Sequence, residues 1–329
     1  MKAVVVDSKI CDLFKSFDIE ERIFTEAGIE FVVGNATSDE EYIKLCKDAD
    51  ALLLVGLKTP RCVIEQLEKC KAIVRYGVGY DVVDVQACSD NGIVLCNVPD
   101  AGTTEVAAQA FALALNCMRK VSYYNTQIHQ GNWHPGEGYE LHRFSTQTFG
   151  FCGFGSIARV VAQYVAGLDC RLIGYDPFVD DALFEKKGVE KVSFEELLEQ
   201  SDVISVHTPL NEHTHHMFSK PVFEKMKRGM IIVNTSRGGV ICQDDLMDAI
   251  DAGIIKAAGL DVNEHEPLTD VHNRILRYDN VVLTPHSAAE SVEYFITLQE
   301  RAARTAIEVL NGKLPRNVIN REQIIKKRD

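Results

Sequence analysis

The chain has 329 residues, with 48 acidic against 35 basic side chains and a formal net charge of −13. This length favours two domains, and the acidic balance argues against a nucleic-acid surface, which needs clustered lysine and arginine. No apolar run approaches the roughly 18 residues of a membrane span, and segment 2–7 has the pattern of a strand rather than a signal peptide, so we expect a cytoplasmic protein without a membrane partner.

Short apolar strands alternate with amphipathic helices along the chain, which is typical of parallel sheets covered by helices on both faces. In the first third the predicted strands are 2–7, 29–33, 51–55, 72–75 and 93–96, with helices such as 19–27 and 39–47 between them. A long helix follows at about 104–119. Six further strands are predicted at 148–152, 171–175, 203–206, 230–234, 257–261 and 281–283. Six strands in this order match a doubly wound dinucleotide-binding sheet.

The last predicted helix, at about 288–310, ends at an Asn-Gly pair, which is a good helix stop. We expect this helix to return the chain to the first domain. The predicted fold is therefore α/β with two Rossmann-like parallel-sheet domains. One is discontinuous and flavodoxin-like, formed by 1–100 and 287–329. The other is doubly wound and covers 101–286.

A glycine turn predicts a nucleotide site in the doubly wound domain. The turn runs from Gly153 to Ala158, directly after strand 148–152 and at the start of a helix, whose free N–H groups can bind a pyrophosphate. Asp176, 23 positions after Gly153, ends the next strand and can accept hydrogen bonds from the adenine ribose. Its carboxylate would repel a 2′-phosphate, which favours NAD over NADP. A ligand-free turn and another nucleotide, such as a methyl donor, are the alternatives.

An arginine and a histidine follow two later strands, so both should reach the carboxyl edge of the sheet, where ligands bind in open α/β folds. Arg237 presents two parallel donors that suit a substrate carboxylate. His286 suits proton transfer, because the unperturbed pKa of histidine lies near neutrality. Together with a dinucleotide, these groups indicate hydride transfer to or from a hydroxy acid. Without the other groups, Arg237 would be interpreted as an ordinary surface arginine and His286 as a histidine bonded to backbone at a strand end.

A carboxylate beside the imidazole would orient the ring and stabilise its charged form. Glu266 is the leading candidate, while Glu264 and Asp261 remain rivals by residue pattern alone. Asp261 ends its strand and can instead bind the nicotinamide carboxamide.

The chain resembles the D-isomer-specific 2-hydroxyacid dehydrogenase family, most clearly from Ile73 to Val318. The similar motifs are Arg75-Tyr76-Gly77-Val78-Gly79-Tyr80-Asp81, Gly153-Phe154-Gly155-Ser156-Ile157-Ala158, His207-Thr208-Pro209-Leu210, Asn234-Thr235-Ser236-Arg237-Gly238, Asp261 with Glu266-Pro267, and Thr284-Pro285-His286. The spacings of 29 residues from Arg237 to Glu266 and 20 from Glu266 to His286 are also similar to the family pattern.

This resemblance implies an NAD-dependent enzyme in which His286 is the acid/base, Glu266 its partner and Arg237 the substrate anchor. The implied cofactor contacts are Gly153, Phe154, Gly155, Ser156, Ile157, Asp176, His207, Thr208, Pro209, Thr235, Ser236, Arg237, Asp261 and His286. The implied substrate contacts are Arg75, Tyr76, Val78, Gly79 and Arg237, with the backbone N–H groups of Val78 and Gly79 on the substrate carboxylate. The resemblance also implies a homodimer formed through the NAD-binding domain, 101–286, with 1–100 and 287–329 as the substrate domain.

Two alternatives to a general 2-oxo acid reductase stay open. Arg75 can meet a second anionic group, as in D-3-phosphoglycerate dehydrogenase, or can form an ordinary salt bridge at a strand end. The glycine loop after Arg75 also resembles that of C-terminal binding proteins, which would make the chain an NAD(H)-sensing scaffold. The chain departs from the family at Cys242-Gln243, where an Asp-Glu pair is usual, and at Asn263, where an aromatic residue is usual.

Ten cysteines without a C-x-x-C pair indicate reduced, mostly buried thiols, and we expect a packing role for Cys242. The spacing of His213, His215 and His216 would allow metal binding, but a solvated loop is the favoured interpretation. No metal site is therefore predicted.

Overall fold

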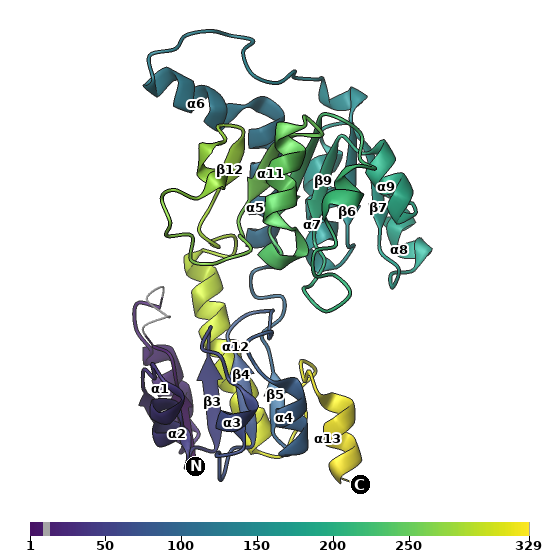
Figure 1. Cartoon of the computed structure of the whole chain (residues 1–329). Helices are drawn as coiled ribbons and strands as arrows, with labels where there is room; N and C mark the ends of the chain where they lie inside the picture. Colours follow the sequence, from purple (N-terminus) through teal and green to yellow (C-terminus); the bar gives the residue numbers. More distant parts are fainter. Residues whose placement is uncertain (9–13, 329) are drawn as a thin grey trace. The chain divides into compact units, whose positions relative to one another are not determined.

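The computed structural model describes residues 1–8 and 14–328, and it divides into two compact units (Figure 1). The first consists of Met1–Gly102 and Glu290–Asp329, and the second of Thr103–Ala289. Each unit has its own parallel sheet with helices on both faces, as the alternation of strands and helices predicts. None of the helices in the described ranges is long and apolar enough for a membrane crossing.

The sheet of the first unit has the flavodoxin-like order β2-β1-β3-β4-β5, and every pair is parallel. Its strands are β1 (Lys2–Val5), β2 (Glu30–Val33), β3 (Ala51–Leu54), β4 (Ala72–Arg75) and β5 (Val94–Cys96). Its helices are α1 (Asp18–Glu26), α2 (Asp39–Cys46), α3 (Arg61–Ile64), α4 (Val85–Asp90), α12 (Val292–Leu310) and α13 (Arg321–Arg328). Side chains alternate along the strands, so that Val5 packs in the core under α1 and α12 while Val4 packs in the opposite core with α2.

The sheet of the second unit has seven parallel strands in the order β12-β11-β10-β9-β6-β7-β8, which is a doubly wound arrangement. Its strands are β6 (Thr148–Cys152), β7 (Arg171–Tyr175), β8 (Glu190–Lys191), β9 (Val203–Val206), β10 (Met230–Asn234), β11 (Ile255–Leu260) and β12 (Val281–Leu283). The helices are α5 (Thr103–Arg119), α6 (Val121–His129), α7 (Ser156–Ala166), α8 (Asp181–Lys186), α9 (Phe194–Gln200), α10 (Lys220–Phe223) and α11 (Gln243–Asp251), with short 3-10 turns at Phe144–Thr146, Gly238–Val240 and Arg274–Arg277. One core lies with α5 and α7, the other with α9, α10 and α11.

The predicted fold class is confirmed, but two details differ. β8 was not predicted, because it has only two residues, both exposed and charged, at the end of the sheet. The last long helix begins at Val292 rather than at about 288. Ser291 caps it by accepting a hydrogen bond from the Tyr294 N–H at 2.9 Å, and the residues before Ser291 are held in a turn described below.

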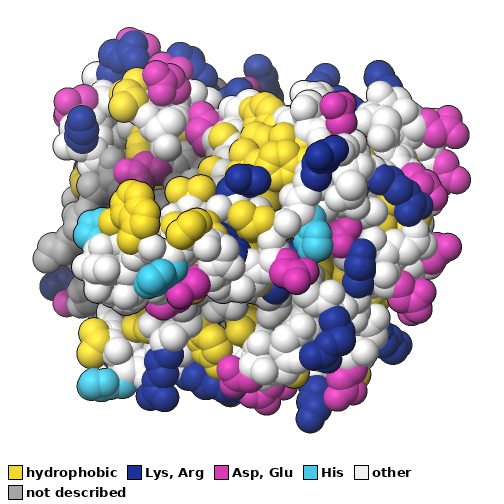
Figure 2. All heavy atoms as spheres, turned by 90° about the horizontal axis from the view of Figure 1, so that it is seen from above, with side chains coloured by type: hydrophobic (Ala, Val, Ile, Leu, Met, Phe, Trp, Pro, Cys, Tyr) yellow, Lys and Arg dark blue, Asp and Glu magenta, His cyan; other side chains and the backbone are white. Residues whose placement is uncertain are grey.

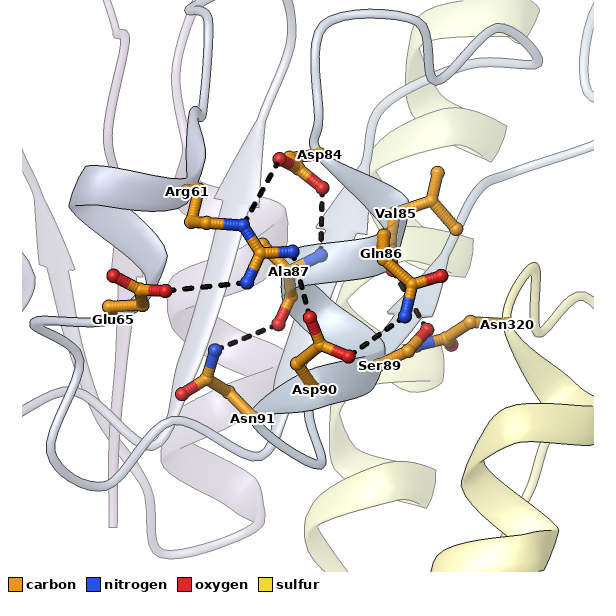
Figure 3. A network of polar contacts seen from close by, with 10 residues as sticks. All are labelled: Arg61, Glu65, Asp84, Val85, Gln86, Ala87, Ser89, Asp90, Asn91 and Asn320. Carbon is orange, nitrogen blue, oxygen red and sulfur yellow. Dashed lines mark hydrogen bonds and ion pairs between the residues drawn. The ribbon is translucent and has the colours of Figure 1, made fainter.

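Polar contacts fasten the C-terminal segment and the short helices of the first unit (Figure 3). Asn320 is fully buried; its Oδ1 accepts from the Leu95 N–H at 3.0 Å and its Nδ2 donates to the Ile93 carbonyl at 2.9 Å. At the surface, Arg61 in α3 pairs with Glu65 at the end of the same helix at 3.3 Å and reaches α4 through Asp90 at 2.8 Å. The buried amide matters more for stability, because its loss would leave buried backbone groups without these hydrogen bonds, whereas an exposed ion pair contributes little.

Candidate active site

The predicted cofactor and catalytic residues of the second unit lie just beyond the carboxyl ends of six parallel strands. The sheet order reverses between β6 and β9, and this is the position at which open α/β sheets bind ligands. The segments in question follow β6, β7, β9, β10, β11 and β12. Parallel pairing therefore brings together residues that are more than one hundred positions apart in the sequence.

The glycine turn after β6 leaves space for a dinucleotide. Gly153 has φ +87°, and a Cβ there would lie 2.9 Å from the carbonyl carbon and oxygen of His207, so only glycine fits. Gly155 precedes α7 without a side-chain cap, and a Cβ there would meet nothing within 4 Å. Uncapped N–H groups facing open space at a helix start fit the pyrophosphate of a dinucleotide.

Asp176 is fixed against this turn. Its two carboxylate oxygens accept from the Phe154 N–H at 2.8 Å and from the Phe178 N–H at 2.9 Å. The ring of Phe154 is buried and stacks on Phe184 with centroids 4.1 Å apart. The side chain of Phe154, one of the predicted cofactor contacts, therefore belongs to the hydrophobic core. Asp176 provides a negative charge at the end of β7, next to the glycine turn.

Two threonine hydroxyls at the same edge are buried and lack a hydrogen-bond partner within the described ranges: Thr208 after β9 and Thr235 after β10. Buried polar atoms are normally satisfied, so these hydroxyls fit a site that receives a polar ligand. Beside Thr208, the His207 Nε2 lies 2.8 Å from the Ser205 hydroxyl, and burial lowers the pKa of His207 to about 4. His207 is thus neutral at physiological pH.

The imidazole of His286 meets the carboxylate of Glu266, with Nδ1 and Oε2 2.8 Å apart. The other carboxylate oxygen accepts from the Asn263 N–H at 2.8 Å. Burial by itself would raise the pKa of Glu266, but the hydrogen bonds from His286 and Asn263 and the charge of Arg237 hold it below its ordinary value. Arg237, Glu266 and His286 therefore share one electrostatic environment, in which Glu266 is ionised at neutral pH.

Asp261 holds the turn that presents His286. It is fully buried, and it accepts hydrogen bonds from the Thr284 hydroxyl at 2.5 Å and from the N–H groups of Ser287 and Ala288 at 3.0 Å. The N–H of His286 donates to the Asp261 carbonyl at 2.8 Å, and His286 has φ +55°. A left-handed histidine costs roughly 1–2 kcal/mol, which these bonds offset. Asp261 is thus a positioning residue, a role that its place at a strand end does not reveal.

Asn234 holds the turn that presents Arg237. Its side chain is buried, donates to the Arg237 carbonyl at 2.9 Å and accepts from the Ser236 N–H and hydroxyl at 2.9 and 2.7 Å. The next residue, Gly238, packs so tightly that a Cβ would lie 1.9 Å from the Asn263 carbonyl oxygen. The arginine loop and the Glu266 loop are therefore in backbone contact.

Glu264, a rival for the contact with His286, has a different partner. Its Oε1 lies 2.5 Å from the Nε2 of His216, and its Oε2 accepts from the Gln243 N–H at 2.9 Å. Burial would raise the pKa of Glu264, but these two hydrogen bonds lower it overall. The carboxylate in contact with His286 is that of Glu266.

In the first unit, the predicted substrate residues lie at the end of β4. Tyr76 is buried, and it donates through its hydroxyl to Glu20 at 2.7 Å and through its N–H to the Leu54 carbonyl at 2.8 Å, so neither donor is left for a substrate. Arg75 donates to the Val55 carbonyl at 3.0 Å. The side chain of Val78 is 53% exposed, and no hydrogen bond within the described part of the chain uses the N–H of Val78 or Gly79.

The family model described as D-isomer specific 2-hydroxyacid dehydrogenase, NAD binding domain, matches residues 111–288. The chain belongs to this family. It is accordingly an NAD-dependent oxidoreductase acting on 2-hydroxy acids, and NAD is its cofactor.

Individual members of the family cover most of the chain. A D-3-phosphoglycerate dehydrogenase of Methanocaldococcus jannaschii is 37% identical over 92% of this chain, which spans only 57% of that protein. A glyoxylate reductase of Korarchaeum cryptofilum is 37% identical, with 87% of each chain covered. The solved structure of an acyclic imino acid reductase in complex with NADPH and D-Arg has a TM-score of 0.86 and 27% identity, covering 97% of this chain and 100% of that one.

Proposed function

We propose that this 2-hydroxyacid dehydrogenase interconverts a 2-oxo acid and the D-2-hydroxy acid, with His286 as the acid/base, Glu266 as its orienting partner and Arg237 as the substrate anchor. The observation that carries the proposal is the 2.8 Å contact between His286 Nδ1 and Glu266, within the field of Arg237. Domain 101–286 would bind NAD, and 1–100 with 287–329 would bind the substrate.

The protein groups divide the work of the reaction. Bound NADH would supply the hydride to carbon 2 of the 2-oxo acid. The Nδ1 of His286 faces Glu266, which leaves Nε2 to give a proton to the carbonyl oxygen. The ionised Glu266 stabilises the protonated ring before transfer and keeps the ring in orientation. Arg237 would hold the carboxylate and polarise the carbonyl through its parallel donors.

The substrate carboxylate would also be held by the N–H groups of Val78 and Gly79, for which the described hydrogen bonds leave both donors available. Arg75 donates one of its five guanidinium N–H groups to the Val55 carbonyl, so a substrate with a second anionic group, as in D-3-phosphoglycerate, is the alternative of the same class. The NAD(H)-sensing scaffold remains the alternative of another class.

NAD would be preferred over NADP because of Asp176. Its carboxylate is fixed by two N–H groups at the glycine turn, where a 2′-phosphate would add negative charge next to it. The contacts proposed for the cofactor are the glycine turn, Asp176, Thr208 and Thr235, with Ser156, Ile157, Pro209, Ser236 and Asp261 as predicted further members.

A homodimer formed through the cofactor domain is supported by apolar side chains that are exposed on and after α6: Val121 at 60%, Ile128 at 47% and Trp133 at 79%. The face seen in Figure 2 shows hydrophobic side chains gathered between charged ones. A cytoplasmic location is supported by the cysteines: all nine described ones are free thiols, and burial raises the pKa of Cys46, Cys117 and Cys152 to about 12. Cys11 lies outside the described residues.

A panel of 2-oxo acids with NADH and with NADPH tests the proposal. We expect turnover with at least one of glyoxylate, hydroxypyruvate, pyruvate, phenylpyruvate and 3-phosphohydroxypyruvate, and a preference for NADH. Arg237→Ala should lower kcat/KM by at least about 100-fold while NADH binding survives. Arg228→Ala, at an exposed arginine of the same unit, is the matched control. NADH binding without turnover of any compound would favour the scaffold instead.

A further inference from the structure

A second group of chemically reactive side chains lies outside the proposed catalytic trio. It consists of His216, in the turn after β9, Cys242, directly before α11, and Glu264, after β11. One ligand atom from each residue lies within 4.8 Å of those of the other two. All three residues are half-buried, so an ion can reach them from solvent although the protein covers part of each side chain. Residues 26 and 22 positions apart are thus gathered by the fold at one place.

The atoms in this group are of the types that zinc prefers: an imidazole nitrogen, a thiol sulfur and a carboxylate oxygen. Bonds of 2.0–2.3 Å place tetrahedral ligands about 3.3–3.6 Å apart. The Nε2 of His216 and the Oε1 of Glu264 are in hydrogen-bond contact at 2.5 Å, and the largest separation in the group is 4.8 Å at most. Shifts of about 1 Å would therefore give three ligands of a tetrahedron and leave its fourth position for water.

The surroundings hold two of the ligands in place. The second carboxylate oxygen of Glu264 accepts from the Gln243 N–H at 2.9 Å, a type of outer contact that orients metal ligands. His216 has φ +52°, its N–H donates to the Gly239 carbonyl at 2.8 Å, and its ring stacks on that of His215 with centroids 3.9 Å apart. A non-glycine residue in the left-handed region is kept there by its neighbours and is common at functional sites.

We propose that His216, Cys242 and Glu264 bind one divalent cation of the zinc type through Nε2, Sγ and Oε1. On binding, the Cys242 thiol would lose its proton to solvent, and the neutral ring of His216 would carry its proton on Nδ1, so that the cation takes the place of the hydrogen bond between Nε2 and Glu264. A thiolate and a carboxylate would then balance the two positive charges, which lowers the cost of holding an ion in a half-buried place.

The cation would connect the segments that follow β9, β10 and β11. These segments also carry Thr208, Arg237 and Glu266, so the ion would stabilise the loops of the proposed active site without being part of the chemistry. This role does not depend on the proposed reaction, and it is tested by metal binding rather than by turnover.

The test uses the full chain without an affinity tag, treated with a chelator and then titrated with Zn²⁺ by calorimetry, with bound metal measured after dialysis. We expect one zinc per chain and a higher Tm with zinc. Cys242→Ser, His216→Asn and Glu264→Gln should each weaken binding at least 10-fold. His213→Asn, in the same turn, and His286→Asn, in the trio, are matched controls that should keep the full stoichiometry.

Cobalt separates the proposal from loss of folding in a variant. Co²⁺ added to the unmodified chain should give the near-ultraviolet absorption of a thiolate–cobalt bond, which Cys242→Ser should lose and Cys62→Ser, at an exposed thiol, should keep. The proposal is overturned if the unmodified chain shows no such band. It is also overturned if the three ligand variants bind zinc as tightly as the unmodified chain does. Loss of zinc with His286→Asn alone would also overturn it, because the ion would then belong to the other pair.

Discussion

Two histidine–glutamate pairs with nitrogen–oxygen distances of 2.8 Å or less lie in the loops of the second unit, and their glutamates are only two positions apart. In both pairs the histidine is left-handed, with φ +55° at His286 and +52° at His216, and in both its N–H donates to a backbone carbonyl at 2.8 Å. His286 meets Glu266 through Nδ1, whereas His216 meets Glu264 through Nε2. The first arrangement leaves Nε2 available for proton transfer, and the second uses it.

The neighbours of the two pairs differ as well. Arg237 contributes positive charge to the first pair, and a thiol, Cys242, lies beside the second. A histidine and a glutamate in contact therefore do not by themselves define a function. The ring nitrogen that remains available and the third group nearby decide between proton transfer and metal binding.

The largest expected effect comes from removing one imidazole at a time. His286→Asn should lower kcat/KM by about 1,000-fold, because the proton donor is lost. His216→Asn should change kcat/KM by less than about 5-fold, since that ring is not placed in the catalytic machinery. Steady-state kinetics with the best 2-oxo acid of the panel measures both. If the two variants lose kcat/KM equally, the two histidine–glutamate pairs do not have different functions.

A third histidine sharpens the comparison, because His207 contacts the Ser205 hydroxyl rather than a carboxylate. Its folded-state pKa of about 4 lies below the ordinary value of 6.5, so between these values the unfolded chain takes up a proton that the folded chain does not. The contribution of His207 to the free energy of unfolding should be complete above pH 6.5. As the pH falls toward 4, this contribution should decrease by at most about 3 kcal/mol.

Urea unfolding at several pH values measures this effect. His207→Gln should flatten the fall between pH 6.5 and 4, whereas His272→Gln, at an exposed histidine, should leave it unchanged. If the two variants have the same pH dependence as the unmodified chain, the low pKa of His207 is refuted.

The glutamates should differ less than the histidines. Glu266→Gln keeps a hydrogen-bond acceptor for His286 but removes the charge, and we expect a loss of about 100-fold in kcat/KM, or about 2.7 kcal/mol. Glu264→Gln should lower kcat/KM by less than about 3-fold. Both variants should be compared at saturating NADH. A greater loss with Glu264→Gln would reverse the assignment of the two carboxylates.

Much of the fold followed from local patterns. The strands of both sheets were predictable because each is a short apolar run between turn residues, and parallel order followed from the helices between them. β8 was not predicted, because its two charged residues show no alternation of apolar and polar side chains. Ser291 shows the same limit at a helix end: the hydrophobic pattern extends to residue 288, but the cap and the turn before it fix the start at Val292.

The sequence alone determined that a glycine turn follows β6, that an acidic residue ends the next strand, and that an arginine, an acidic loop and a histidine come after later strands. These features are local or follow from the spacing of motifs. The resemblance to the family also implied Glu266 as the partner of His286, which the residue pattern by itself left open. Only the tertiary structure decided that Glu264 meets His216, that Asp261 and Asn234 hold the turns of His286 and Arg237, and that Cys242 joins the second pair. Such contacts depend on strand order and on the path of each loop, which place residues distant in sequence within a few ångströms, and no local pattern encodes them.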